Sequence, residues 1–252
     1  MPRIEIPVDV LLNILDYVDK ADLATICLLN KICCSCSQDV LYRDIHVKNR
    51  KILWTLAKST DLARKVRSFN LCSTGSKLAM ALRNMTSLRI LNIQTLFDMD
   101  ILVGCTFKLD SFECFYTKCR VESFLKFFSS QPSLKYLKIP LCSDSAESSL
   151  EATGLPNLTR IESSFLWLKI LIPGSPVNEV ITTGYTSNEH SIDLSFFTLS
   201  TAPIQNLTID YSFLYPTPGH LLASFLPSLT HLTLRIGKYF TTHGGVCGLP
   251  LY

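Results

Sequence analysis

The sequence contains no apolar run long enough to cross a lipid bilayer. A membrane-spanning helix needs about 20 mostly apolar residues, whereas the longest candidate, residues 164–173, is short and contains Lys169. The first residues include Glu5 and Asp9, where a signal peptide would require an apolar segment. We therefore expect no membrane partner and a location in the cytoplasm, the nucleus or both.

Sequence motifs that mark common enzymes are also missing. The five histidines are scattered, and none lies in a His-Glu-x-x-His metal motif. The chain has neither a Gly-x-Ser-x-Gly nucleophile motif nor a glycine-rich phosphate loop. We therefore expect a non-enzymatic protein with no catalytic residue and no cofactor. A triad built from distant residues stays open, because geometry and not spacing defines a triad.

The ten cysteines show no ordered spacing, and no export signal accompanies them. Free thiols are therefore expected, since disulfides persist in oxidising compartments. Cys33, Cys34 and Cys36 form the one cluster. A zinc site would need a further ligand pair at a suitable distance, and none is evident, so no metal is predicted.

Charged residues are few, at 18% of the chain, while 47% of the residues are apolar. This composition is sufficient for a packed core and argues against disorder. The net charge of +3 is unevenly distributed, because residues 1–47 carry −3 and residues 48–68 carry +6. The basic segment could meet an acidic partner, or it could be a solvated helix over residues 52–63. No nucleic-acid motif accompanies it, so nucleic acid is not an expected partner.

Apolar residues at helical spacing indicate three short helices within residues 6–43. Pro7 suits the first turn of a helix, and the stripe that follows consists of Val8, Leu11, Leu12, Leu15 and Val18. A second helix is expected after Asp19, and a third over residues 33–43. Three short helices bury little surface, so such a module usually needs a partner or an adjoining domain to complete its core.

These residues resemble an F-box, the small helical module that attaches a substrate receptor to a cullin–RING ubiquitin ligase. Ile6-Pro7 and Asp9 match the opening Leu-Pro and acidic residue of the family pattern. Asp22-Leu23 matches its middle, and Asn30-Lys31 stands where Cys-Lys is usual.

The sequence departs from the F-box pattern at two aromatic positions. Cys33 replaces the usual Trp, and Tyr42 replaces the last aromatic residue, so a large anchor is lost. The resemblance implies that a Skp-type adaptor would contact Pro7, Leu11, Ile14, Leu15, Leu23, Leu28, Leu41 and Tyr42.

The remainder of the chain repeats an apolar-x-x-apolar-x-apolar pattern. Eight copies begin 19–27 residues apart, at residues 66, 88, 109, 134, 158, 177, 204 and 229. Leucine-rich repeats have a period of about 20–29 residues, and each unit packs only against its neighbours. The alternative is an ordinary α/β fold whose strands are separated by longer regular helices.

The fold class that we predict is α/β, with a three-helix F-box module followed by an irregular leucine-rich-repeat solenoid. Parallel strands would line its concave side, and helices or loops its convex side. The predicted ranges are an F-box-like module at 1–47, a basic helical linker or first convex helix at 48–65, about eight repeats at 66–240, and a tail at 241–252. That tail would cap a solenoid poorly, which indicates either a truncated chain or a partner that covers the end.

Residues between the apolar positions of each strand should point to the concave face, because side chains alternate along a strand. Phe115 and Tyr136 are the expected aromatic anchors, since aromatic residues often dominate interface energetics. The alternative is that most residues on this face are solvated spacers. The predicted substrate-binding residues are Asn92, Glu113, Phe115, Tyr136, Lys138, Arg160, His231 and Arg235.

The resemblance as a whole implies a non-catalytic substrate receptor of a Skp–cullin–F-box ubiquitin ligase. Its partners would be a Skp-family adaptor, a cullin reached through that adaptor, and an unidentified protein substrate. The competing interpretation is a leucine-rich-repeat scaffold whose first helices only cap the repeats. Packing of the first helix against the first repeat would favour the scaffold, whereas exposure of its apolar residues would favour the receptor.

Overall fold

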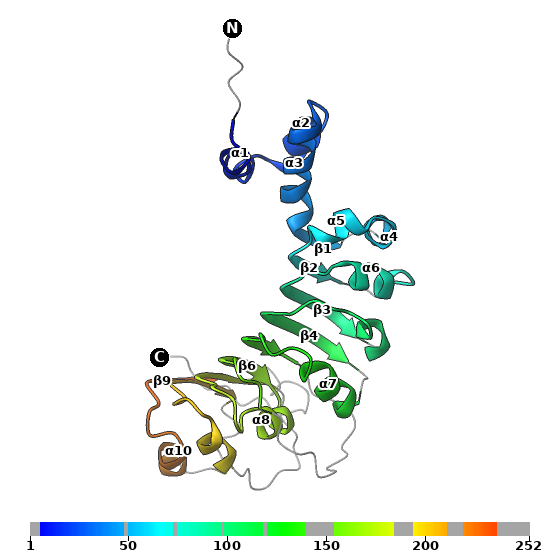
Figure 1. Cartoon of the computed structure of the whole chain (residues 1–252). Helices are drawn as coiled ribbons and strands as arrows, with labels where there is room; N and C mark the ends of the chain where they lie inside the picture. Colours follow the sequence, from blue (N-terminus) through cyan, green and yellow to red (C-terminus); the bar gives the residue numbers. More distant parts are fainter. Residues whose placement is uncertain are drawn as a thin grey trace, which may run out of the picture.

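The structure is a computed structural model that describes residues 6–47, 50–72, 75–96, 98–117, 120–139, 154–183, 194–210 and 219–235. Nine strands of this part form one parallel sheet, and their order in the sheet is their order in the sequence (Figure 1). The strands are β1 Asp44–Val47, β2 Ser68–Leu71, β3 Ile90–Leu96, β4 Ser111–Thr117, β5 Tyr136–Lys138, β6 Arg160–Ser163, β7 Glu179–Thr182, β8 Asn206–Asp210 and β9 His231–Arg235. The predicted α/β class is confirmed, and the predicted tail at 241–252 lies outside the described residues.

Each parallel step needs a crossover connection, and helices supply many of them. Figure 1 shows α4, α5, α6 and α7 on one side of the strands. The helical connections are α4 Lys51–Lys58, α5 Thr60–Arg64, α6 Leu78–Asn84, α7 Val121–Phe128, α8 Phe165–Leu171 and α10 Gly219–Phe225, with short 3₁₀ helices η1 Met99–Leu102 and η2 Ser195–Leu199. The other face carries exposed and half-buried side chains along β2, β3, β4 and β5.

A row of apolar side chains, aligned from strand to strand, runs through the core. Phe69 pairs with Leu91, Leu91 with Phe112, and Phe112 with Leu137, and all four side chains are fully buried. Full burial of such a side chain contributes about 1.5–3 kcal/mol. All eight predicted repeat patterns contain a strand in this sheet.

The apolar residues of β9 are not buried like those of the other strands. Leu232 and Leu234 stand at predicted core positions but are 45% and 43% exposed. The expectation that they are buried is wrong. In the described part of the chain no further strand pairs with β9, so no neighbouring repeat covers these side chains.

Strand β1 carries a ninth copy of the pattern, which the sequence predictions assigned to the helical module. Tyr42, Ile45 and Val47 repeat the spacing of Val66, Phe69 and Leu71, and Ile45 pairs with Phe69. Tyr42 packs against the sheet core. Tyr42 therefore connects the third helix to the sheet, and its predicted contact with an adaptor stays a prediction.

The basic segment forms two helices where one was expected over residues 52–63. Ser59 separates α4 from α5 because its backbone is extended, with φ −109° and ψ 100°. Its hydroxyl accepts a 3.3 Å hydrogen bond from the Leu62 amide and so caps α5. Leu53 and Leu56 of α4 are buried against the sheet.

The N-terminal helices α1 (Val8–Leu15), α2 (Lys20–Ile26) and α3 (Lys31–Arg43) form a separate small core. Leu15, Leu23 and Cys36 are its buried residues, because α1 and α2 both pack on α3. In Figure 1, α1 and α2 lie at one end of the molecule, and α3 leads from them to β1. No helix among the described residues is long and apolar enough to span a membrane.

Candidate functional site

The N-terminal helices expose an unusual share of large apolar side chains. Of the seventeen such exposed residues in the described chain, eight lie within residues 6–32, and Tyr17 and Leu28 are 92% and 84% exposed. Soluble monomers rarely leave large apolar patches uncovered unless a partner binds them. The eight residues are Ile6, Val8, Val10, Ile14, Tyr17, Leu28, Leu29 and Ile32.

The predicted adaptor residues divide into three groups in the structure. Pro7, Ile14 and Leu28 are exposed, as a contact surface requires. Leu11 and Leu41 are partly buried against the small helical core. Both side chains therefore pack inside the module and leave only part of their surface for a partner.

Leu15 and Leu23 do not lie on the surface, so their predicted adaptor contacts are corrected. Both are buried, at 2% and 1% exposure, against Cys36 of α3. Helical periodicity identified an apolar stripe on α1 but not which part of it turns toward α3. Val10 is an exposed apolar residue of α1 that the prediction missed, and it lies four residues before the predicted Ile14, on the same side of the helix.

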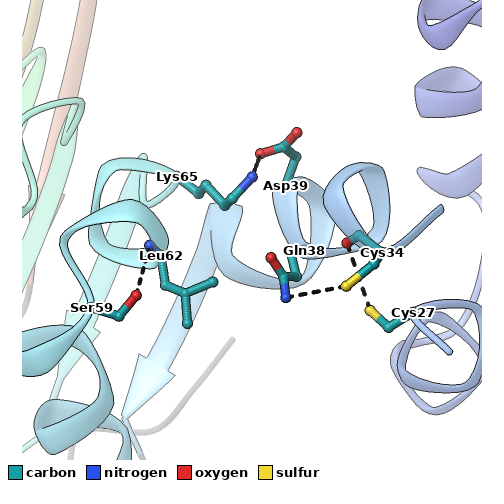
Figure 2. Close-up of polar contacts among 7 residues, drawn as sticks. All are labelled: Cys27, Cys34, Gln38, Asp39, Ser59, Leu62 and Lys65. Atoms are coloured by element: carbon teal, nitrogen blue, oxygen red, sulfur yellow. Dashed lines mark hydrogen bonds and ion pairs between the residues drawn. The ribbon is translucent and has the colours of Figure 1, made fainter. Parts of the chain in front are cut away.

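Two hydrogen bonds hold the first turn of α3, which contains Cys33, the position of a Trp in the F-box pattern. Asn30 caps α3, because its side-chain oxygen accepts a 2.8 Å hydrogen bond from the Cys33 amide. This cap begins the helix at Lys31, two residues before the predicted start. Cys27 donates its Sγ hydrogen to the Cys34 carbonyl oxygen at 3.9 Å, which links the end of α2 to α3 (Figure 2).

The cysteines of the module have the character of packing residues. Burial raises the pKa of the Cys27 thiol, with Cys34 adding to the effect. Burial and the nearby Asp39 carboxylate raise the pKa of the Cys36 thiol. Thiolates are the nucleophilic and metal-binding form, and the described residues contain no group of three or more potential ligands that could hold a metal ion.

A second candidate surface lies on the open face of the sheet. We call it the sheet-face cluster, and its members are Glu113 and Phe115 of β4, Tyr136 and Lys138 of β5, Arg160 and Glu162 of β6, and Glu179 of β7. The strand register brings them together, because Glu113 pairs with Lys138 and Lys138 with Glu162.

Ion pairs and ring contacts run across the cluster from strand to strand. Lys138 Nζ lies 2.8 Å from Glu162 Oε1 and 4.8 Å from the centre of the Phe115 ring. The Arg160 guanidinium stacks 5.1 Å from the Tyr136 ring. Its Nε lies 3.4 Å from Glu179 Oε1. These contacts hold long side chains in fixed positions, which lowers the entropy that they would lose on binding a partner.

Glu162 is the most buried carboxylate of the cluster, although it is not among the predicted substrate-binding residues. Glu162 is only 8% exposed. Its carboxylate forms an ion pair with the Lys138 ammonium and accepts a 3.3 Å hydrogen bond from the Tyr136 hydroxyl. Alternation along β6 placed it on this face, but no sequence signal distinguished it from a solvated spacer. Ile181, its register partner on β7, is also buried.

The cluster carries three carboxylates and two cations, so its net charge is negative. Partial burial raises the pKa of Glu113, against the opposing effect of Lys138. Burial and the Glu162 carboxylate raise the pKa of Tyr136, which therefore stays a neutral hydrogen-bond donor. Beside Glu113 in the register, Asn92 Oδ1 is buried and has no hydrogen-bond partner among the described residues.

Six of the eight predicted substrate-binding residues lie on neighbouring strands. Asn92, Glu113, Phe115, Tyr136, Lys138 and Arg160 occupy β3 to β6. His231 and Arg235 are exposed on β9, three strands beyond β6, or roughly 14 Å at the usual spacing of parallel strands. No protein-family model matches the chain, and no curated protein matches it significantly.

Proposed function

We propose that this protein is the substrate-recognition subunit of a Skp–cullin–F-box ubiquitin ligase. The observation that carries the proposal is the exposed apolar surface of α1–α3, with Ile14 at 50% and Leu28 at 84% exposure. These side chains pack against neither the small helical core nor the sheet core. A folded partner would remove this surface from water, with a gain of about 25 cal/mol per Å² of apolar area.

The order of the strands supports a leucine-rich-repeat architecture for the rest of the chain. Nine parallel strands follow one another without reordering, and the repeat starts are 19–27 residues apart. In such an array each unit buries its apolar face against its neighbours. The open face then offers an extended surface for a protein target, with the sheet-face cluster as its most structured part.

The proposed mechanism is proximity rather than catalysis by this chain. The helical module docks on the adaptor, and the sheet holds the target near the charged ubiquitin carrier of the ligase. Holding two reactants together raises their effective concentration by orders of magnitude. Bond formation is then carried out by the other subunits.

A second candidate function is a repeat scaffold with a helical cap and no role in ubiquitin transfer. It is favoured by the way α3 joins the sheet. Tyr42 at the end of α3 packs into the sheet core, and Asp39 forms an ion pair with Lys65 at the end of α5 (Figure 2). The C-terminal half of α3 is therefore anchored to the sheet core and to the end of α5, as expected of a cap.

Direct binding to a purified Skp-type adaptor separates the two candidates. We expect the wild-type chain to bind, and Ile14→Asp/Leu28→Asp to weaken binding by about tenfold or more, since buried aspartate costs several kcal/mol. Both positions are exposed, so the variant should fold. Val103→Asp, at a 60% exposed apolar position outside the module, is the matched control and should bind normally.

Failure of well-folded wild-type protein to bind the adaptor would remove the receptor proposal and leave the scaffold. Loss of binding in the Val103→Asp control as well would mean that the contact is not confined to α1–α3. Circular dichroism of each variant checks that the helices remain folded.

A further inference from the structure

The basic segment that follows the helical module has no role in the proposed ligase function. In the structure, part of it surrounds a recess of about 490 Å³ at the junction between the helices and the sheet. The recess is lined by Leu12 of α1, Asp39 and Arg43 of α3, Asp61 and Arg64 of α5, and Lys65, Arg67 and Ser87. The lining comes from four separate stretches of the chain, and two of them supply its four cationic residues, Arg43 from α3 and Arg64, Lys65 and Arg67 from the segment that ends α5.

Two of these arginines belong to a row that continues along the sheet. The Arg67 amide donates to the Arg43 carbonyl oxygen at 2.9 Å, and the Arg89 amide donates to that of Arg67 at 2.8 Å. The three arginines therefore precede β1, β2 and β3 in adjacent register positions, at a strand spacing of about 4.8 Å. Like charges on neighbouring strands are destabilising unless an opposite charge lies between them.

Carboxylates of the protein neutralise only part of this charge. Asp39 forms an ion pair with Lys65, and Asp16 contacts Arg43 at 2.8 Å. Arg64 and Arg67 have no carboxylate partner among the described residues.

Asp61 is the one other acidic residue of the recess lining. Arg89 donates from Nη1 to the Lys108 carbonyl oxygen at 3.4 Å, a contact that cancels no charge. The recess and the adjoining Arg89 therefore keep an excess of two positive charges.

We propose that this recess binds a phosphate monoester, held by Arg64 and Arg67 with the Ser87 hydroxyl as a further donor. A phosphate monoester carries about −1.5 to −2 charges at pH 7, which matches the excess on the protein. Guanidinium groups recognise phosphate through paired N–H donors. The recess volume admits the phosphoryl group together with part of the molecule that bears it.

The place of the recess gives binding a structural consequence. It lies between α1, α3 and α5 and the start of β2 and β3, so a bound phosphate would connect the helical module to the sheet. The inference does not depend on the ligase proposal, because it rests on charge and geometry alone.

The test uses the full chain and two probes, inorganic phosphate and the peptide acetyl-Gly-phosphoserine-Gly-amide. Binding is measured by calorimetry and by the ³¹P resonance of each probe at low ionic strength, where screening is weak. We expect Arg64→Gln/Arg67→Gln to weaken binding by about tenfold or more. The matched control is Arg120→Gln/Lys126→Gln, which also removes two positive charges, from exposed positions before and within α7, and should bind as the wild type does.

The two probes distinguish the sources of the phosphate. Binding of both assigns the site to a phosphorylated side chain, whereas binding of inorganic phosphate alone assigns it to a small phosphorylated molecule. The proposal is overturned if neither probe binds, if the double variant binds as tightly as the control, or if the peptide with glutamate in place of phosphoserine binds equally well. Neither arginine forms an ion pair in the described structure, so loss of fold is not expected on their replacement.

Discussion

Glu113 and Glu162 show how neighbouring residues give two carboxylates on one face different properties. Glu162 receives the Lys138 ammonium and the Tyr136 hydroxyl. Glu113 is partly buried beside Asn92 Oδ1, and desolvation raises its pKa from the ordinary value of 4.5. The first carboxylate is satisfied within the protein, whereas the second offers an acceptor to a ligand that brings a hydrogen-bond donor.

The raised pKa of Glu113 predicts a pH-dependent effect of Glu113→Gln on stability. The folded state binds the Glu113 proton more tightly than the unfolded state does. Protonation of Glu113 therefore contributes to the free energy of unfolding in full below about pH 4.5, and this contribution is lost as pH rises through the folded pKa. At pH 7 the neutral glutamine should therefore raise the free energy of unfolding. Urea unfolding at pH 7 and below pH 4.5 measures the difference, which should vanish at the lower pH.

The matched control for this measurement is Glu122→Gln, in the exposed first turn of α7. A carboxylate there favours the helix, so its replacement should leave stability unchanged or lower it slightly. A stabilising effect of equal size in both variants would contradict the role assigned to desolvation of Glu113.

Two phenylalanines on β4 provide a test of the core. Phe112 is fully buried and lies 5.8–6.4 Å from the rings of Phe124, Phe127 and Phe128, whereas Phe115 is 49% exposed. Phe112→Ala should lower the free energy of unfolding by about 3–5 kcal/mol. Phe115→Ala should change it far less, although it removes the ring beneath Lys138. Similar losses in chemical denaturation would show that β4 does not face the core as described.

Among the elements, α3 has the widest range of contacts. Its first half supports α1 and α2 through Cys36, and its last residues continue directly into β1. Asp39 and Arg43 connect it to Lys65 and Asp16. Displacement of α3 would therefore alter both the exposed apolar surface and the basic recess.

The cap at the start of α3 can be removed with little other change. Asn30→Ala loses the 2.8 Å hydrogen bond to the Cys33 amide and should cost about 1 kcal/mol of stability. Asn13→Ala, at an exposed position within α1, removes the same side chain without a cap and should be neutral or slightly stabilising. Thermal denaturation followed by circular dichroism compares the two, and equal behaviour would argue against the cap.

At the scale of the whole molecule, two cores of unequal size share one chain. The sheet core extends from Ile45 to Leu226, whereas the helical core has only three buried residues. Apolar burial stabilises roughly in proportion to area, so the helical module should open more readily than the sheet.

Hydrogen exchange tests this difference directly. Amides of α1 and α2 should exchange faster than those of β2 to β6, because their local opening exposes little apolar surface. Addition of a bound adaptor should slow exchange in α1 and α2 if these helices form its contact surface. Equal protection of both parts in the free chain would indicate one cooperative unit instead of two.

Much of the fold could be predicted from the sequence because its determinants are local. Apolar residues at positions such as 66, 69 and 71 mark a strand and its buried face, and the recurrence of the spacing predicts parallel neighbours. The same pattern at Tyr42, Ile45 and Val47 was missed, since it begins inside the last turn of α3 and continues directly into β1. Ser59 was missed because a capping bond depends on a backbone break that periodicity does not report.

The sequence by itself determined the strands, most helices and the side of the sheet on which each side chain lies, because alternation and helical period are properties of the chain. Tertiary structure alone decided which apolar residues of α1 and α2 are buried, since that depends on where α3 lies. It also brought Glu162 into contact with Lys138 and Tyr136, and it placed Arg43, Arg64 and Arg67 around one recess. These groupings arise from strand register and helix packing, which join residues that are distant along the chain.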